Sequence, residues 1–183
     1  MKAIPTQTSL LFLDEILNKS DINEGSVVAD LGCGRSLLFL NLLANKVGKE
    51  GVVYGVDILP EVIESIERDI KHHGLQEVSI VQGDLEKLNG VSINNNAIDI
   101  AFLVNTINQI ADTTSLLQEV TRILKDSGKL IIIDWHQSES PIGPIQDQRI
   151  SLQQIKKVLN SAKLSILDEF EAGPYHYGLV VSQ

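Results

Sequence analysis

The stretch Val27–Phe39, which reads Val-Val-Ala-Asp-Leu-Gly-Cys-Gly-Arg-Ser-Leu-Leu-Phe, decides the fold of this 183-residue chain. An apolar run enters a short glycine turn, and apolar residues at helical spacing follow it. This is the strand–turn–helix pattern that opens nucleotide-binding α/β folds. Gly32 and Gly34 allow the backbone to approach a ligand closely. Asp30, which precedes them, favours a cationic or hydroxyl-bearing part of a ligand over a pyrophosphate.

Apolar periodicity and turn residues divide the chain into alternating strands and helices. Strands are expected at residues 27–31, 52–56, 78–81, 98–104 and 130–133. Helices are expected at residues 8–19, from Leu37 to near Gly48, from Pro60 to Gly74, after Asp112, and from Ser151 to about Ala162. Two further strand segments, 164–170 and 177–182, are separated by a short connection that contains Gly173-Pro174, and such a connection joins antiparallel strands. The chain is therefore predicted to be α/β, with a mostly parallel sheet and one reversed strand in a C-terminal hairpin.

The length and the charge indicate one domain, residues 1–183, that acts on a small molecule. A chain of 183 residues is long enough for one sizeable core. Its formal net charge is −9, and its basic residues are scattered. Because nucleic-acid binding needs a Lys/Arg surface that neutralises phosphates, we expect no nucleic-acid partner.

The cysteine count and the apolar runs bear on metal binding and on location. Cys33 is the only cysteine, so the chain forms no internal disulfide and no cysteine-cluster metal site. The apolar run at residues 10–13 is interrupted by Asp14 and Glu15, which argues against a secretory leader. No apolar run approaches the roughly 18 residues that a membrane helix requires. We therefore expect a cytoplasmic protein without a metal or a membrane segment. Nothing in these residues indicates an oligomeric state.

Acidic residues follow three strands at the same edge of the predicted sheet. Asp30 stands at the end of the first strand, and Asp57 closes the second, where α/β folds place a carboxylate against ribose hydroxyls. Gly83-Asp84 follows the third strand. Because ligands of open α/β sheets bind along the carboxyl edge, these residues predict a ligand crevice there. A tight turn without a ligand, beside exposed strand-end acids, is the alternative explanation.

The glycine turn by itself does not identify the ligand. A dinucleotide-binding fingerprint would carry a third glycine where Leu37 stands. A P-loop would end in Gly-Lys-Ser or Gly-Lys-Thr, which this turn does not contain.

Five motifs in order along the chain resemble those of the class I S-adenosylmethionine-dependent methyltransferases. They are Val28–Ser36, Val53–Ile58, Val81–Leu85, Ile98–Asn105 and Gly128–Asp134. The resemblance covers residues from about Ile22 to Val181, and the C-terminal hairpin matches the reversed last strand that distinguishes this family from dehydrogenases. It implies a Rossmann-like three-layer sandwich with a seven-stranded sheet, and S-adenosylmethionine as cofactor.

The same resemblance assigns the methionine and ribose parts of the cofactor. Asp30 and the backbone of Gly32, Cys33 and Gly34 would hold the methionine portion. Asp57 would accept hydrogen bonds from both ribose hydroxyls.

The resemblance also assigns the adenine end. Ile58 would pack on the adenine ring, Asp84, after Gly83, would accept from its amino group, and the Leu85 N–H would bind a ring nitrogen. Asn105 would face the methionine amino group through its carbonyl. Ser36 stands where many relatives carry a third glycine.

Transfer from a sulfonium is an in-line displacement with an activated leaving group, so positioning supplies much of the catalysis. A general base is needed only if the acceptor must lose a proton. His136, after the fifth strand, is the candidate base, and a hydrogen-bonded surface histidine is its alternative role. Asn108, Trp135 and Tyr175 are the candidate acceptor contacts. The helix within residues 1–22 is expected to cover the cofactor and substrate site.

Two other functions stay open from the sequence. A nicotinamide-dependent oxidoreductase also needs a ribose-binding acid, but Leu37 and the terminal hairpin argue against it. A non-catalytic partner subunit with the cofactor fold is compatible with the compact chain and with the lack of an obvious base. A related branch that methylates arsenite uses several cysteines, and Cys33 alone argues against that activity.

Overall fold

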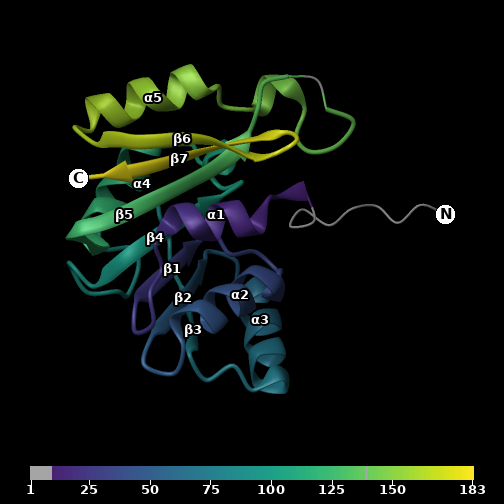
Figure 1. The fold of residues 1–183 in the computed structure, drawn as a ribbon, viewed down its shortest axis with the longest axis vertical. Helices are drawn as coiled ribbons and strands as arrows, with labels where there is room; N and C mark the ends of the chain where they lie inside the picture. Colours follow the sequence, from purple (N-terminus) through teal and green to yellow (C-terminus); the bar gives the residue numbers. More distant parts are fainter. Residues whose placement is uncertain (1–9, 139) are drawn as a thin grey trace.

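A seven-stranded sheet runs through the molecule, and helices cover both of its faces (Figure 1). The computed structural model describes residues 10–138 and 140–183. The strand order is β3-β2-β1-β4-β5-β7-β6. The strands are β1 (Val27–Leu31), β2 (Val52–Asp57), β3 (Val78–Gln82), β4 (Ile98–Val104), β5 (Leu124–Trp135), β6 (Ser165–Gly173) and β7 (His176–Ser182).

The first five strands are parallel to one another, and only β7 is reversed. It pairs antiparallel with β5 on one side and with β6 on the other. The predicted mostly parallel sheet with one reversed strand in a C-terminal hairpin is therefore confirmed. In this order β1 lies between β2 and β4, so the chain leaves β1 toward one side and later returns to the other. Such a reversal of strand order opens a crevice at the carboxyl ends of the strands.

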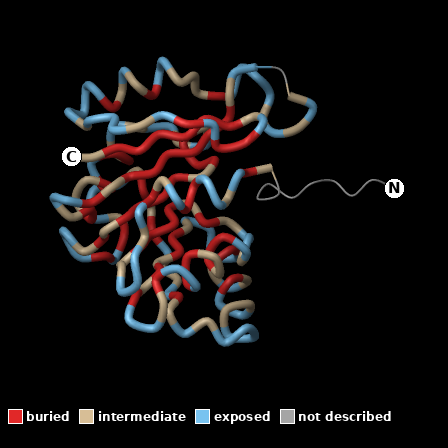
Figure 2. The backbone as a smooth tube through the Cα atoms, viewed as in Figure 1, coloured by how far each residue is buried: buried red, intermediate tan, exposed pale blue. Residues whose placement is uncertain are grey.

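Two groups of helices form the outer layers. The helices are α1 (Leu13–Ser20), α2 (Leu37–Val47), α3 (Pro60–His73), α4 (Thr113–Ile123) and α5 (Leu152–Ser161), with short 3-10 turns η2 (Ile107–Gln109) and η3 (Gln146–Gln148). One buried cluster joins α1, α2 and α3 to one face of the sheet, and the other joins α4 and α5 to the opposite face. Neighbouring residues such as Phe102 and Leu103 of β4 face different clusters, as the pleat requires. Figure 2 shows the buried residues concentrated along the central strands.

The helix ends follow the predicted signals. Pro60 occupies the first turn of α3, and Gly74 ends that helix in a left-handed conformation with a φ of 68°. The Asp112 side chain caps α4, because it accepts hydrogen bonds from the Thr114 and Ser115 N–H groups. Ser151 forms a capping box with Gln154 at the start of α5.

The N-terminal helix differs from its prediction over residues 8–19. The α-helix begins only at Leu13; residues 8 and 9 lie outside the described part of the chain. The Phe12 N–H donates to the Ala172 carbonyl at 2.8 Å, which fixes the preceding backbone against β6. Because this amide pairs with a neighbouring strand, the helix begins later than the apolar pattern indicates.

The predicted fifth strand is longer than residues 130–133, and one connection lacks a helix. β5 extends on both sides of its apolar centre, because Leu124 pairs with Ile98 and Trp135 pairs with His176. The alternation of strands and helices is interrupted between β3 and β4, where residues 83–97 contain no helix.

Within the described residues, no helix is long and apolar enough to cross a membrane.

Removing the capping box should weaken α5 without affecting the carboxyl edge of the sheet. The Ser151 Oγ accepts the Gln154 N–H at 3.1 Å, and the Gln154 Oε1 accepts the Ser151 N–H at 2.8 Å. We expect Ser151→Ala to lower the free energy of unfolding by about 1 kcal/mol in urea titrations. Ser161→Ala, at the other end of the same helix, should change it by less than about 0.5 kcal/mol. Equal losses in the two variants would contradict this assignment.

Candidate functional site

A cavity of about 850 Å³ opens at the carboxyl ends of β1, β2, β3 and β4. Its lining includes all ten residues that the sequence predicts to bind the cofactor, namely Asp30, Gly32, Cys33, Gly34, Asp57, Ile58, Gly83, Asp84, Leu85 and Asn105. These residues come from four separate segments of the chain, and the parallel register of the strands brings them to one edge. The structure therefore assembles one site from the predicted motifs.

The glycine turn after β1 is held by the end of β2. The N–H groups of Gly32 and Cys33 both donate to the Val56 carbonyl, at 2.8 and 3.0 Å. Gly32 has a φ of 83°, and a Cβ there would lie 2.7 Å from Oγ1 and Cγ2 of Thr106. Both the backbone conformation and the lack of space exclude a side chain at this position. The turn thus lies directly beside the end of β4.

Asp57 connects the glycine turn to the start of α3. Its Oδ2 accepts the Gly34 N–H at 3.0 Å, and its Oδ1 accepts the Leu59 N–H at 3.0 Å. A carboxylate has about four acceptor positions, so it can accept further hydrogen bonds from a ligand. Ile58 and Leu59 line the cavity with 54% and 47% of their surface exposed. They offer an apolar contact next to these acceptor oxygens.

Asp30 is buried beneath the turn, with 3% of its surface exposed. Burial raises the pKa of its carboxyl to about 7, and the negative charge of Asp57 adds to this rise. A cation that enters the cavity would favour the ionised carboxylate and lower this pKa again. The side chain is therefore suited to a positively charged part of a ligand.

Cys33 faces the same cavity but has little nucleophilic character. Burial raises the pKa of its thiol well above the ordinary range, and the charges of Asp30 and Asp57 raise it further. The thiolate is the reactive form of cysteine, so this side chain acts as a small apolar part of the wall.

Asn105 follows β4 and carries an unpaired acceptor. Its φ is 57°, and its N–H donates to the Ile133 carbonyl at 2.8 Å. Its carbonyl accepts the Gln109 side-chain amide at 2.9 Å, which leaves one lone pair for a ligand donor. Its Oδ1 is buried without a hydrogen-bond partner. The carbonyl, not this buried Oδ1, is therefore the acceptor that Asn105 can offer to a ligand.

The segment after β3 contributes Gly83, Asp84 and Leu85. Lys87 lies 2.9 Å from Asp84, and the Glu86 N–H donates to the same carboxylate at 3.0 Å. The hydrogen bond from Lys87, followed by that from Glu86, lowers the pKa of Asp84 below its ordinary value. Asp84 therefore presents a carboxylate at this end of the cavity.

The candidate base and two candidate acceptor contacts are not brought to this cavity. His136, Asn108 and Tyr175 are absent from its lining. The His136 Nε2 lies 3.0 Å from Oε2 of Glu171, and the backbone N–H of His136 donates to the Tyr175 carbonyl at 2.8 Å. The Asn108 side chain donates to Asp134 at 3.4 Å. These three residues lie around the end of β5 beside the hairpin, so their proposed roles stay predictions.

Trp135, the remaining candidate acceptor contact, is buried in packing. It pairs with His176 across β5 and β7, and their ring centroids lie 4.1 Å apart. The Arg149 guanidinium lies 5.3 Å from the indole centroid. Burial between these groups keeps the indole out of the cavity lining, so its predicted contact with the acceptor is not supported by its position.

The N-terminal helix, which the sequence predicts to cover the site, does not itself line the cavity. α1 contacts β6 and β7, and it is Leu11, ahead of this helix, that lines the cavity. Phe39 and Val62 also line the cavity, although the sequence does not predict them there. The apolar spacing that marks Phe39 and Val62 as core residues carries no signal that one side faces a ligand. In residues 10–138 and 140–183, no group of three or more His, Cys, Asp or Glu side chains could hold a metal ion.

Comparison with protein families gives a match over most of the chain. A family model described as "Methyltransferase domain" matches residues 22–166. A 2-phytyl-1,4-naphtoquinone methyltransferase from Nostoc punctiforme is 32% identical over 123 residues, which are 67% of this chain and 52% of that protein. A demethylmenaquinone methyltransferase from Lactobacillus johnsonii is 29% identical over 129 residues, 70% of this chain and 51% of that protein. The chain spans about half the length of these two relatives.

Solved structures agree with this match. A SAM-dependent methyltransferase from Aquifex aeolicus has a TM-score of 0.89 and 25% identity, covering 97% of this chain and 93% of that one. A putative type 11 methyltransferase from Sulfolobus solfataricus has a TM-score of 0.78 and 25% identity, covering 96% and 94%. The fold is thus shared over nearly the whole chain.

Neutralising Asp30 should change how stability depends on pH in the ligand-free protein. Its folded-state pKa of about 7 lies above the ordinary 3.8, so the folded protein binds the proton more tightly and loses stability as the pH rises through this window. Asp30→Asn removes this loss. At about 1.4 kcal/mol per pKa unit, we expect the variant to be more stable than the wild type by about 2–4 kcal/mol at pH 8 and equally stable near pH 4.

Melting temperatures of both proteins from pH 4 to pH 8 test this expectation. Asp84→Asn is the matched control, because its carboxylate has a lowered pKa and its loss should reduce stability at neutral pH. Parallel curves for the wild type and Asp30→Asn would contradict the raised pKa of Asp30.

Proposed function

This chain belongs to the S-adenosylmethionine-dependent methyltransferases, and we propose that it is an enzyme that transfers a methyl group from this cofactor to a small-molecule acceptor. This is the family that the five sequence motifs resemble. One observation carries the proposal: the ten residues assigned to the cofactor all line one cavity at the carboxyl edge of the sheet.

The cavity fits the cofactor in its distribution of charge. Asp30 and the Asn105 carbonyl would face the cationic methionine end, where a positive charge compensates the burial of the carboxyl. Asp57 retains acceptor positions for the ribose hydroxyls, beside the exposed side chain of Ile58 for adenine. When bound, S-adenosylmethionine supplies a methyl group already activated on a sulfonium. The residues named here would hold and orient it.

The acceptor would bind against largely apolar walls. Leu11, Phe39, Val62 and Ile110 line the cavity together with the acidic and amide groups. The chain as a whole carries a net charge of −9, which disfavours polyanionic acceptors. We propose a partly apolar small molecule that is not a polyanion, and the two relatives named as quinone methyltransferases are consistent with this class.

The reaction would not depend on a histidine base at the cavity. Among the described lining residues there is no histidine, and His136 lies beside the hairpin. A base is needed only when the acceptor must lose a proton during transfer. An acceptor that is already ionised, or that has a free lone pair, would therefore suit this site.

Binding of S-adenosylhomocysteine, the demethylated product of the cofactor, tests the cofactor site. Isothermal titration should show binding by the wild type, and Asp57→Ala should weaken it by about tenfold or more through lost charge-assisted hydrogen bonds. Because Asp57 also holds the N–H groups of Gly34 and Leu59, Asp57→Asn serves as a milder second variant. Glu67→Gln, an exposed residue on α3, is the control and should bind as the wild type does. No binding by the wild type at millimolar ligand would refute the proposal.

Methyl transfer itself separates an enzyme from a non-catalytic partner subunit. With S-adenosylmethionine labelled in its methyl group, we expect transfer to a prenylated 1,4-naphthohydroquinone above the rate without protein. Arsenite should receive no label, because Cys33 is the only cysteine of the chain. Cofactor binding without transfer to a wide panel of small molecules would favour the partner-subunit function instead.

A further inference from the structure

The connection from β3 to β4 has an unusual construction. Residues 83–97 contain no helix, although they carry Asp84 and Leu85 to the cavity. Backbone N–H and carbonyl groups in such a connection need partners, because unpaired buried groups are costly. Some of these partners come from two side chains of α4.

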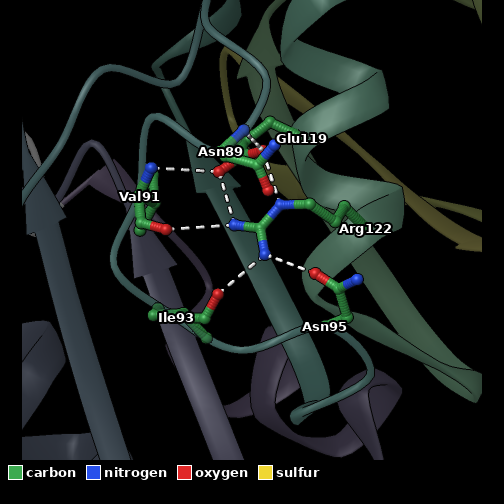
Figure 3. A network of polar contacts seen from close by, with 6 residues as sticks. All are labelled: Asn89, Val91, Ile93, Asn95, Glu119 and Arg122. Carbon is green, nitrogen blue, oxygen red and sulfur yellow. Dashed lines mark hydrogen bonds and ion pairs between the residues drawn. The ribbon is translucent and has the colours of Figure 1, made fainter.

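Glu119 and Arg122, which we call the α4 clamp, bind the far part of this connection (Figure 3). The Glu119 carboxylate accepts the Asn89 N–H at 2.8 Å and the Val91 N–H at 3.0 Å. Arg122 donates to the Val91 carbonyl at 3.0 Å and to the Ile93 carbonyl at 2.8 Å. It also donates to the Asn95 side chain at 2.8 Å. The two side chains thus bind every second residue of the connection from Asn89 to Asn95.

The clamp is itself a buried, two-point ion pair. Nη2 and Nε of Arg122 lie 2.6 and 2.8 Å from the two oxygens of Glu119. The Glu119 side chain is fully buried, and only 11% of the Arg122 side chain is exposed. Burial alone would raise the pKa of Glu119, but hydrogen bonds from Arg122 and from the Val91 and Asn89 N–H groups outweigh it and lower that pKa. The pair therefore stays charged at neutral pH and has a fixed geometry.

The clamped residues lie directly under the residues at the cavity. The Asp84 N–H donates to the Gly90 carbonyl at 3.1 Å, and the Gly90 N–H donates to the Lys87 carbonyl at 2.8 Å. A Cβ on Gly83 would lie 2.9 Å from the Gly90 carbonyl, and one on Gly90 only 2.1 Å from the Asp84 carbonyl. Leu85 packs in the same buried cluster as Val91 and Ile93. Movement of the clamped residues would therefore displace Asp84 and Leu85.

We propose that Glu119 and Arg122 are positioning residues that set how the site recognises the adenine ring, by fixing the backbone under Asp84 and Leu85. The inference rests on the proposed function, since it takes this end of the cavity to hold adenine. Neither residue lines the cavity, so both act through the connection. The structure assigns α4 a role in base recognition besides its packing on the sheet.

The test compares two ligands that differ at the edge of the base that Asp84 and the Leu85 N–H are assigned to read. S-adenosylhomocysteine carries an amino group on the base beside an unprotonated ring nitrogen. S-inosylhomocysteine carries a carbonyl there, which would face the Asp84 carboxylate, beside a ring N–H, which would face the Leu85 N–H. In the wild type we expect the adenosyl ligand to bind about tenfold or more tightly than the inosyl ligand. Arg122→Lys keeps the charge but loses the two-point pair, and it should bring this ratio down by about fivefold or more. Glu119→Gln, which keeps the shape of the side chain, should lower the ratio in the same direction.

Two controls separate positioning from general destabilisation. Lys125→Met breaks an ion pair with Asp99 near the amino end of β4, away from the cavity, and should leave the ratio unchanged. In an Asp84→Asn background the ratio should already be lower, and adding Arg122→Lys should lower it by a smaller factor than it does in the wild type. All titrations are made well below the melting temperature of each variant.

Each outcome decides one claim. If Arg122→Lys and Glu119→Gln lower the melting temperature but bind both ligands more weakly by the same factor, the clamp is only structural and the inference is wrong. If the wild type binds both ligands equally, the inference fails while the proposed cofactor site stands. If the wild type binds neither ligand, the proposed function fails and the inference fails with it.

Discussion

The close approach at Gly32 is the constraint on which the rest of the site depends. Its left-handed backbone and the Thr106 side chain leave no room for a Cβ, so the end of β1 lies against the end of β4. The Thr106 hydroxyl donates to the Leu31 carbonyl at 2.9 Å and completes this contact. The Gly32 and Cys33 N–H groups join the same turn to β2. Three parallel strands are thereby fixed at one edge, where the cavity opens.

This arrangement places acidic groups around a cavity in a protein that is already acidic. Burial, and then the charge of Asp57, raise the cost of ionising Asp30, so a cationic ligand would relieve an unfavourable charge distribution. Asp84 differs because Lys87 and a backbone N–H stabilise its carboxylate. The cavity therefore has one end where ionisation of a carboxyl is unfavourable and another end where the carboxylate is stabilised. A ligand with a cationic methionine end and a neutral base matches this difference.

The mostly parallel sheet and the hairpin can be predicted from local signals in the sequence, and the resemblance of its motifs to a known family indicates the ten residues that line the cavity. The start of α1 could not be predicted, because the Phe12 N–H pairs with Ala172, a contact between residues far apart in sequence. For the same reason the hydrogen bonds that Glu119 accepts from the connection 83–97 leave no periodic pattern in the sequence. Trp135 was expected at the site because it ends β5, yet the hairpin and Arg149 enclose it.

A ligand titration monitored through the amide NMR signals of the protein tests most directly whether this cavity binds the adenosyl cofactor. Adding S-adenosylhomocysteine to the isotope-labelled protein should shift the amide signals of Gly32, Gly34, Ile58 and Leu85, which line the cavity. Signals from α5, on the far side of the hairpin from this edge, should stay in place. Shifts confined to residues 140–149, where a second hollow lies around Arg149, would contradict the account, as would no shifts at saturating ligand.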